Sequence, residues 1–314
     1  MKKSLVLLLI SSLVSGLYAR QPRTVVEPPF AFRNSGTLEI ERIELAPEST
    51  TVYIQAYFRP HNWIRISSET YIRTGAEGEK LTVRSADGMP LDTEFYMPET
   101  GRHDFSLSFP PVDPKTAKID LIESDCPDCF KIYDIDLTGK KAKPGRSALA
   151  KKYKKAAPLT ENFTAPVVSD SPARIAGAIT GYDPRFFDRI EIAFYSPIVG
   201  DGATELSVPV REDGSFETGL NILTPIRGML FLPGFVTLPF YAEPGRETAL
   251  EIDLGAVYRK TSVFKELHPQ TSPVAYYGEL GRVNEELARL QKIQVRTGTH
   301  HIGYHFDRLT RIHG

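Results

Sequence analysis

Two cysteines separated by two residues, Cys126 and Cys129, are the part of the sequence best suited to chemistry. They are the only cysteines in the 314-residue chain. A C-x-x-C pair can exchange dithiol for disulfide, close a small structural disulfide, or supply two of the four ligands of a structural zinc site. The elements that hold the pair decide among these uses.

The stretch from Ala117 to Leu137 contains the pair, and its apolar residues alternate with polar ones on both sides of it. A period of two residues is typical of strands, so the cysteines are predicted in the loop of a hairpin. A redox thiol needs a helix N-terminus to lower its pKa, and here a strand follows. Proline also follows the first cysteine, whereas the thioredoxin motif has it just before the second. We therefore favour a structural disulfide, with free thiols, catalytic dithiol exchange and zinc as alternatives in that order.

The first 19 residues have the pattern of a secretory signal peptide. Lys2 and Lys3 precede an apolar run from Leu5 to Ile10, and small or weakly polar residues follow. The run is too short for a transmembrane helix, and no cysteine lies near the end of the segment for a lipid anchor. We expect an exported product, periplasmic or associated with the outer envelope, with a buried N-terminal helix as the alternative.

The remaining chain, about 295 residues, is long enough for two domains of ordinary size. Its 38 basic and 39 acidic residues leave a formal charge of −1, which gives no reason to expect nucleic-acid binding. With 24 prolines and 23 glycines between short alternating runs, the composition favours all-β modules. The predicted class is mainly β, with two consecutive immunoglobulin-like β-sandwich modules and one amphipathic C-terminal helix.

An extended lead-in, residues 20–36, is expected to pack as an edge before the first sandwich, residues 37–137. Short strands separated by turn clusters such as Ala86-Asp87-Gly88 give this region the spacing of an immunoglobulin-like sandwich. Trp63 lies in an alternating run, so we interpret it first as a core or strand-edge residue and second as a platform for stacking sugars.

A basic linker is predicted at residues 138–164, which hold eight lysines and arginines and few apolar groups. The second sandwich is predicted at residues 165–258, where the turn Glu212-Asp213-Gly214 between alternating runs indicates a hairpin. Tyr182, beside Asp183 and Pro184 in a turn, is a second candidate platform.

One amphipathic helix is predicted over residues 272–293, with Ser272 as N-cap and Pro273 at the first helical position. It is expected to pack on the second sandwich or to bind an envelope partner through an apolar face made of Tyr277, Leu280, Val283, Leu287 and Leu290. A polar tail, residues 294–314, follows. His301 and His305 could bind a metal only in a helix that Gly298 and Gly303 weaken, so no metal or cofactor is predicted.

Several phrases of the sequence resemble one family. They are Thr24–Pro29, Trp63–Ile66, Asp120–Glu123, Phe130–Leu137, Gly177–Tyr182, Asp213–Phe216 and Phe240–Gly245. These look like the N-terminal half of TlpA-like thiol-disulfide oxidoreductases of the Gram-negative envelope, and the likeness covers most of residues 22 to 292. The resemblance implies β-rich modules and a helical connector ahead of a thioredoxin domain that carries the catalytic C-x-x-C. Cys126 and Cys129 do not map onto that catalytic pair, and the chain ends where the family would continue.

The predicted function is therefore a non-catalytic, exported scaffold or interaction region of such an oxidoreductase, without its thioredoxin domain. Dithiol exchange through Cys126 and Cys129 is one alternative. A glycan-binding module with Trp63 or Tyr182 as its platform is another.

Overall fold

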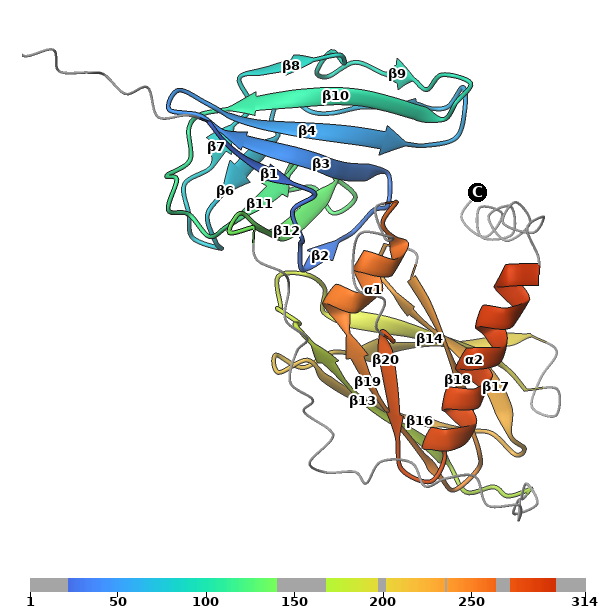
Figure 1. The fold of residues 1–314 in the computed structure, drawn as a ribbon. Coiled ribbons are helices and arrows are strands. Elements are labelled where there is room, and N and C mark those ends of the chain that lie inside the picture. The colour runs from blue at the N-terminus through green and yellow to red at the C-terminus, as the bar shows by residue number, and fades with distance from the viewer. Residues whose placement is uncertain (1–21, 140–167, 197–201, 235, 264–271, 298–314) are drawn as a thin grey trace, which may run out of the picture.

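The computed structural model describes residues 22–139, 168–196, 202–234, 236–263 and 272–297, with the side chains of residues 291–297 excepted. Strands predominate, and they form two pairs of packed sheets, one pair in each half of the chain (Figure 1). The prediction of a mainly β fold with consecutive sandwiches is confirmed. We call the two pairs the first and the second sandwich.

The first sandwich packs two five-stranded sheets around one apolar core. Alternation accounts for this, since Val52, Ile54 and Ala56 of one strand are all buried, whereas Thr51 and Tyr53 between them are partly exposed. One sheet contains, in spatial order, β1 (Arg23–Val26), β3 (Leu38–Leu45), β4 (Thr50–Tyr57), β10 (Arg102–Phe109) and β8 (Ser85–Asp87). The other contains β2 (Phe32–Arg33), β12 (Lys131–Asp136), β11 (Lys118–Ile122), β6 (Tyr71–Arg73) and β7 (Leu81–Thr82).

The extended lead-in belongs to this sandwich. Strand β1 pairs with β3 at the edge of one sheet, and β2 pairs with β12 at the edge of the other. The turn predicted at Ala86-Asp87-Gly88 is wrong for its first two residues, which belong to strand β8 and pair with β10. The long strand β10 offers its free edge to this segment, and only Gly88, with φ +86°, turns the chain.

The second sandwich packs two four-stranded sheets. One holds β16 (Ser215–Leu220), β13 (Ala173–Thr180), β19 (Glu247–Asp253) and β20 (Val274–Tyr277), and the other holds β15 (Ala203–Pro209), β14 (Arg189–Tyr195), β17 (Ile226–Leu232) and β18 (Val236–Ala242). Strands β13 and β19 run parallel. The rings of Phe216 and Phe240 fill the space where a side chain at Gly177 or Gly228 would stand, so glycine is required at both positions.

The described part of the chain contains two helices, α1 (Leu254–Thr261) and α2 (Gly281–Thr297), rather than one. Helix α1 directly follows β19, and its N-cap is Asp253, whose Oδ1 accepts a hydrogen bond from Ala256 N at 2.9 Å. It spans only eight residues, which is too short to show a clear apolar period in the sequence.

The predicted start of the C-terminal helix is wrong. Residues Val274–Tyr277 form β20 against the edge of β19, and the helix begins only at Gly281. The backbone of the β19 edge offers hydrogen bonds to this segment, and Gly278 in the left-handed region (φ +73°) separates strand from helix. Tyr277 and Leu280, assigned to the helical face, are buried before the helix starts.

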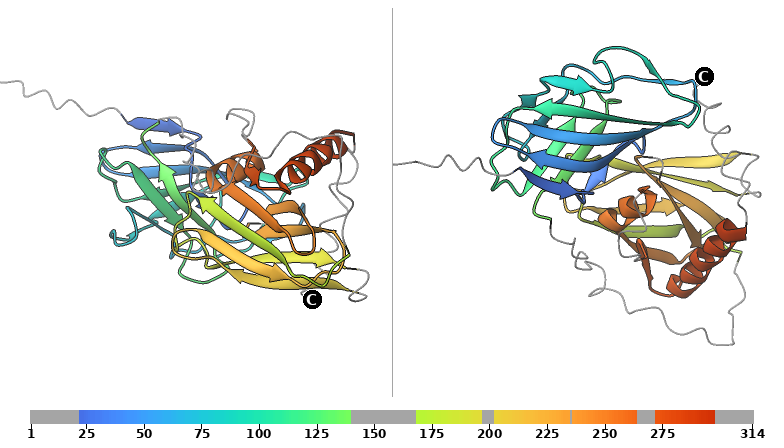
Figure 2. Two further views of the ribbon diagram at one scale, coloured as in Figure 1. Left: turned by 90° about the horizontal axis from the view of Figure 1, so that it is seen from below. Right: turned by 45° about the horizontal axis from the view of Figure 1, so that its top comes forward.

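Helix α2 lies beside β18 and β20, where the two sheets of the second sandwich would otherwise open (Figures 1 and 2). Asn284, only 2% exposed, faces the edge strand β18: its Oδ1 accepts from Tyr241 N at 2.7 Å, and its Nδ2 donates to Tyr241 O at 3.1 Å. One amide therefore satisfies both backbone groups of an edge residue.

Several predicted segments lie outside the described residues: the signal peptide (residues 1–19), residues 140–164 of the basic linker, and residues 298–314 with His301 and His305. Residues 294–297, assigned to the tail, continue α2. Within the described ranges, no helix combines the length and apolarity that crossing a bilayer requires.

Candidate functional site

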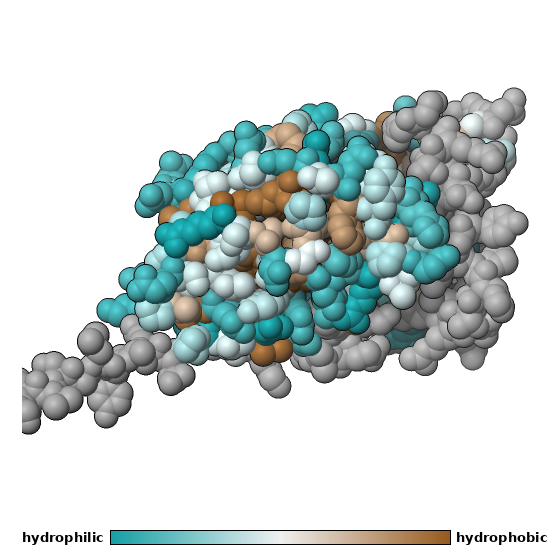
Figure 3. Space-filling view, turned by 90° about the horizontal axis from the view of Figure 1, so that it is seen from above, coloured by the Kyte–Doolittle hydropathy of each residue, from teal (hydrophilic) through white to brown (hydrophobic). Residues whose placement is uncertain are grey.

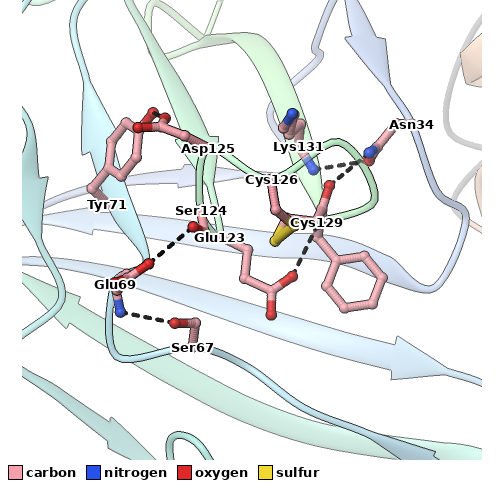
Figure 4. The surroundings of a disulfide bond; sticks show 11 residues. Asn34, Ser67, Glu69, Tyr71, Glu123, Ser124, Asp125, Cys126, Cys129 and Lys131 are labelled. Carbon is pink, nitrogen blue, oxygen red and sulfur yellow. Dashed lines mark hydrogen bonds between the residues drawn. A yellow bond between two sulfur atoms is a disulfide. The ribbon is translucent and has the colours of Figure 1, made fainter.

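The predicted hairpin and its disulfide are both present. Strands β11 and β12 are joined by residues 123–130, which we call the cystine loop, and Cys126 and Cys129 are bonded there with their Cα atoms 5.4 Å apart (Figure 4). A strand, and not a helix, follows the pair. Cys126 is exposed and Cys129 partly buried, so the disulfide lies at the surface.

Hydrogen bonds hold both ends of the cystine loop. Glu123 Oε2 accepts from Phe130 N at 3.0 Å, and Asn34 Nδ2 donates to Cys129 O at 2.7 Å while Asn34 Oδ1 accepts from Lys131 N at 2.8 Å (Figure 4). Burial raises the pKa of the Glu123 carboxyl. The loop is thereby fastened to its own hairpin and to the segment after β2.

The exposed side of the loop is fastened by Asp125. Its carboxylate accepts hydrogen bonds from Lys80 Nζ at 2.6 Å and from the Tyr71 hydroxyl at 2.8 Å. These bonds lower the pKa of Asp125, and burial together with the bond to Asp125 raises the pKa of Tyr71 to about 12. The arrangement stabilises a loop conformation, and the element that follows the cysteines is a strand without the dipole of a helix.

A charged cluster joins the two sandwiches at a surface that we call the junction. Arg185, in the loop between β13 and β14, donates to Asp120 Oδ2 at 2.9 Å and to Asp134 Oδ1 at 3.0 Å in the first sandwich. It also bonds Asp183 in its own loop. Burial alone would lower the pKa of Arg185, but the hydrogen bonds to Asp183 and Asp134 and the charge of Asp120 raise it.

The backbone around these carboxylates is shaped for the junction. The register of β11 and β12 shifts between Ile119 and Leu121, and Asp134 opposite has φ +53°. Asp134 N donates to Asp120 Oδ1 at 2.9 Å, so the bulge presents its own N–H to the buried carboxylate. Alternation along β12 puts Ile132 in the apolar core of the first sandwich and Tyr133 in that of the second.

Aromatic rings pack beside the charges. Phe32 of β2 stacks on Phe186 of the second sandwich with centroids 5.1 Å apart, and the ring of Tyr258 from α1 meets it edge-on at 5.3 Å. Gly234 approaches so closely that a Cβ there would lie 2.9 Å from Arg33 O. Because Phe32 and Tyr133 belong to the same apolar cluster as the second core, the two sandwiches share buried surface.

A second ion pair is fully buried at the junction. Arg33 Nη1 lies 2.7 Å from Glu39 Oε1, and each side chain is 2% exposed. The end of α1 completes the pair, since Glu39 accepts hydrogen bonds from Ser262 Oγ at 3.1 Å and Val263 N at 3.2 Å. A buried pair of this kind is tolerated only when such bonds satisfy its remaining polar atoms.

The other sequence-predicted site residues lie apart. Trp63 is 48% exposed on the two-residue strand β5 (Trp63–Ile64), so it is not a core residue. Tyr182 is partly buried, donates its hydroxyl hydrogen bond to Phe187 O and meets the Phe187 ring at 5.2 Å, so its ring supports the loop of Arg185. Of the predicted partner face on the helix, only Leu290 is exposed.

Two cavities in the described part are small. One, between the sheets of the first sandwich beside Glu123, has a volume of about 10 Å³. The other, about 20 Å³, lies by Phe30 and Arg259 at the junction. Each has room for about one water and not for a substrate. Among the residues that the structure describes, no group of three or more His, Cys, Asp or Glu could hold a metal ion.

Sequence reasoning missed the junction. Arg185 and its partner Asp120 are 65 residues apart, and nothing in the local pattern of either residue indicates the other. One signal of a contact surface was available: the turn segment from Tyr182 to Phe187 contains three aromatic residues and an arginine.

Comparisons with known proteins identify no relative. No protein-family model matches the sequence, and no curated protein matches it. Among solved structures, pullulanase type I from Bacillus subtilis str. 168 complexed with maltose has a TM-score of 0.24 and 9% identity, covering 61% of this chain and 23% of that one. Pullulanase from Anoxybacillus sp. LM18-11 has a TM-score of 0.23 and 9% identity, covering 61% and 24%. The chain thus spans about a quarter of the length of these enzymes, and scores this low carry no argument about fold or function.

Proposed function

We propose that this chain is an exported, non-catalytic envelope protein that serves as the scaffold or interaction region of a TlpA-like thiol-disulfide oxidoreductase. The observation that carries the proposal is the junction. Charged pairs and stacked rings hold the two sandwiches together through Arg185, Phe186, Arg33 and Glu39. A scaffold needs modules with a fixed relative position, and a junction that buries both charges and aromatic surface provides it.

Two further features support the proposal. The disulfide in the cystine loop fits an oxidising compartment, as does the leader pattern of residues 1–19. Neither sulfur lies at a helix N-terminus, which is the feature that activates a catalytic thiol.

An insulin-reduction assay tests the non-catalytic part of the proposal. The purified chain should reduce insulin with dithiothreitol no faster than dithiothreitol alone, and Cys126→Ser should behave identically. Turnover above the blank that Cys126→Ser abolishes would establish dithiol exchange instead.

Photocrosslinking tests the scaffold part. A benzoylphenylalanine residue at Leu290, which is 54% exposed on α2, should crosslink in the envelope to a protein with a thioredoxin-like domain. The matched control is the same residue at Tyr195, also 54% exposed but on the second sandwich, which should give no such adduct. Identical adducts from both positions, or none from Leu290, would contradict the proposal.

A further inference from the structure

A small two-stranded ribbon on the first sandwich carries two exposed aromatic side chains. Strand β5 pairs with β9 (Phe95–Tyr96), and Trp63 lies directly opposite Tyr96. Trp63 is 48% and Tyr96 60% exposed, whereas Ile64, the neighbour of Trp63, is 4% exposed. Because side chains alternate along a strand, both rings lie on the outer face, with Cβ atoms roughly 5 Å apart.

The ribbon is held in place by groups other than these rings. Ile64 and Met97 anchor it in the core, and the backbone pairing continues through His61 N to Met97 O at 3.0 Å and Met97 N to Asn62 O at 2.9 Å. Folding therefore leaves much of the Trp63 and Tyr96 surface unused. His61 has φ +62°, a conformation that is costly for a non-glycine residue and is frequent at ligand sites.

Polar groups of both signs surround the rings. The Tyr96 hydroxyl donates to Glu94 Oε2 at 3.0 Å. His61 Nε2 lies 3.1 Å from Glu99 Oε2, and the side chains of His61 and Glu99 are each more than 70% exposed. Arg65, which follows the end of β5, is exposed, and its charge acts on Asp92 and Glu123. Figure 3 looks onto the molecule from above the view of Figure 1 and shows apolar and weakly polar residues in the middle of a hydrophilic surface.

The size and charge of this face select the class of ligand. Two aromatic side chains about half exposed offer roughly 200 Å² of ring surface, whereas a stable protein interface needs about 800 Å² from each partner. Glu94 and Glu99 oppose the positive field that a nucleic acid or a sulfated polymer would need. A pyranose ring has one flat C–H face and a rim of hydroxyl groups, which matches flat rings bordered by donors and acceptors.

We propose that Trp63 and Tyr96 form a stacking platform for a neutral oligosaccharide of hexose or pentose units, with Glu94 and Glu99 hydrogen-bonding its hydroxyl groups. Each ring covers one sugar, and the two-residue platform binds adjacent units of a chain. This site is separate from the junction and from α2. Evidence for or against sugar binding therefore does not bear on the proposed scaffold role.

Fluorescence gives a direct test, because Trp63 is the only tryptophan in the chain. The full chain is titrated with maltohexaose, cellohexaose, xylohexaose and mannohexaose up to millimolar concentration. At least one should shift Trp63 emission saturably, and calorimetry should give the same Kd.

Variants then locate the site. Trp63→Ala and Tyr96→Ala should each weaken binding by about tenfold or more in calorimetry, and Trp63→Phe should retain part of it. Tyr195→Ala, which removes an equally exposed ring from the second sandwich, should leave Kd unchanged. Circular dichroism checks that every variant folds. If Trp63→Ala does not fold, Trp63→Phe takes its place in the test.

Three outcomes would overturn the proposal. One is the absence of any saturable response to the four neutral hexasaccharides. Another is an unchanged Kd in the folded Trp63→Ala variant. If that variant does not fold, an unchanged Kd in both Trp63→Phe and Tyr96→Ala has the same meaning. The third is binding of dextran sulfate alone, which would assign the face to anionic polymers.

Discussion

Arg185 of the second sandwich reaches across the junction to Asp120 of the first, with Nη1 2.9 Å from Oδ2. Asp120 is 1% exposed, and Arg73 of its own sandwich donates to the same oxygen at 3.2 Å. One buried carboxylate is therefore neutralised by a guanidinium from each sandwich. Because a buried charge without its partner is unfavourable, separation of the sandwiches is coupled to the loss of this pair.

Replacement of Arg185 by alanine should lower the free energy of unfolding by about 2–3 kcal/mol, because buried Asp120 loses one of its two guanidinium partners and Asp134 loses its cross-junction partner. Urea denaturation measures the loss. Arg189→Ala is the matched control, since Arg189 pairs with exposed Asp188 and should change nothing measurable. Equal effects of the two substitutions would contradict the structural role of the junction.

Arg33→Met should have a larger effect, lowering the free energy of unfolding by about 3–5 kcal/mol, because it leaves Glu39 buried and unpaired. The double variant Arg33→Met/Glu39→Gln should recover part of the loss, since a neutral amide still offers an acceptor to Ser262 and Val263. Chemical denaturation of both variants gives the comparison. A double variant less stable than the single one would show that the Glu39 charge is not the source of the cost.

Neither of these ion pairs was predictable from local sequence patterns. Strands were predictable from local alternation, as in β11 and β12, where the pattern on both sides of Cys126 and Cys129 predicted the hairpin. Tertiary contacts overrode local signals elsewhere: the proline-led segment at Pro273 satisfies helix-start rules, yet the free edge of β19 turns it into a strand. The pair of Arg185 and Asp120 could not be predicted in this way. A contact between residues far apart in the sequence depends on how the two folded sandwiches meet.

Glu123 predicts a dependence of stability on pH. Burial raises its pKa in the folded state above the ordinary 4.5, so the folded state binds the proton more tightly than the unfolded state. Its contribution to stability is therefore full at pH below 4.5 and decreases as pH rises through the raised folded pKa. Glu123→Gln removes this titration and keeps an acceptor for Phe130 N.

Thermal unfolding from pH 4 to pH 8 measures the difference between wild type and Glu123→Gln. The variant should gain stability relative to wild type as pH rises. Asp128→Asn, in the exposed part of the same loop, is the control and should not reproduce the gain. If the Glu123→Gln variant instead loses stability relative to wild type as pH rises, the ionised carboxylate is the stabilising form.

The disulfide should contribute modestly to stability, because it closes a loop of only four residues. Loop-closure entropy sets its contribution at about 2 kcal/mol, so Cys126→Ser/Cys129→Ser should lose about 1–2 kcal/mol. A phosphine reductant should lower the denaturation midpoint of wild type to that of the double variant and leave the double variant unchanged. A wild-type midpoint unaffected by complete reduction would show that the cystine loop is held by its hydrogen bonds alone.

Asn284 should decide whether α2 stays on the second sandwich. Its amide bonds both Tyr241 N and Tyr241 O. Replacement by alanine takes the acceptor away from Tyr241 N, while Tyr241 O keeps the hydrogen bond from the Thr248 hydroxyl. A buried backbone group that loses its partner costs about 1–3 kcal/mol, so Asn284→Ala should weaken the docking of α2 by that amount. Hydrogen exchange should then quicken in α2 and β18, while β3 and β4 of the first sandwich keep their protection.

Arg289→Ala, on the exposed side of the same helix, should leave exchange unchanged. If Asn284→Ala instead accelerated exchange equally in both sandwiches, α2 would be integral to the whole fold, and its exposed end at Leu290 could not bind a partner independently of the junction.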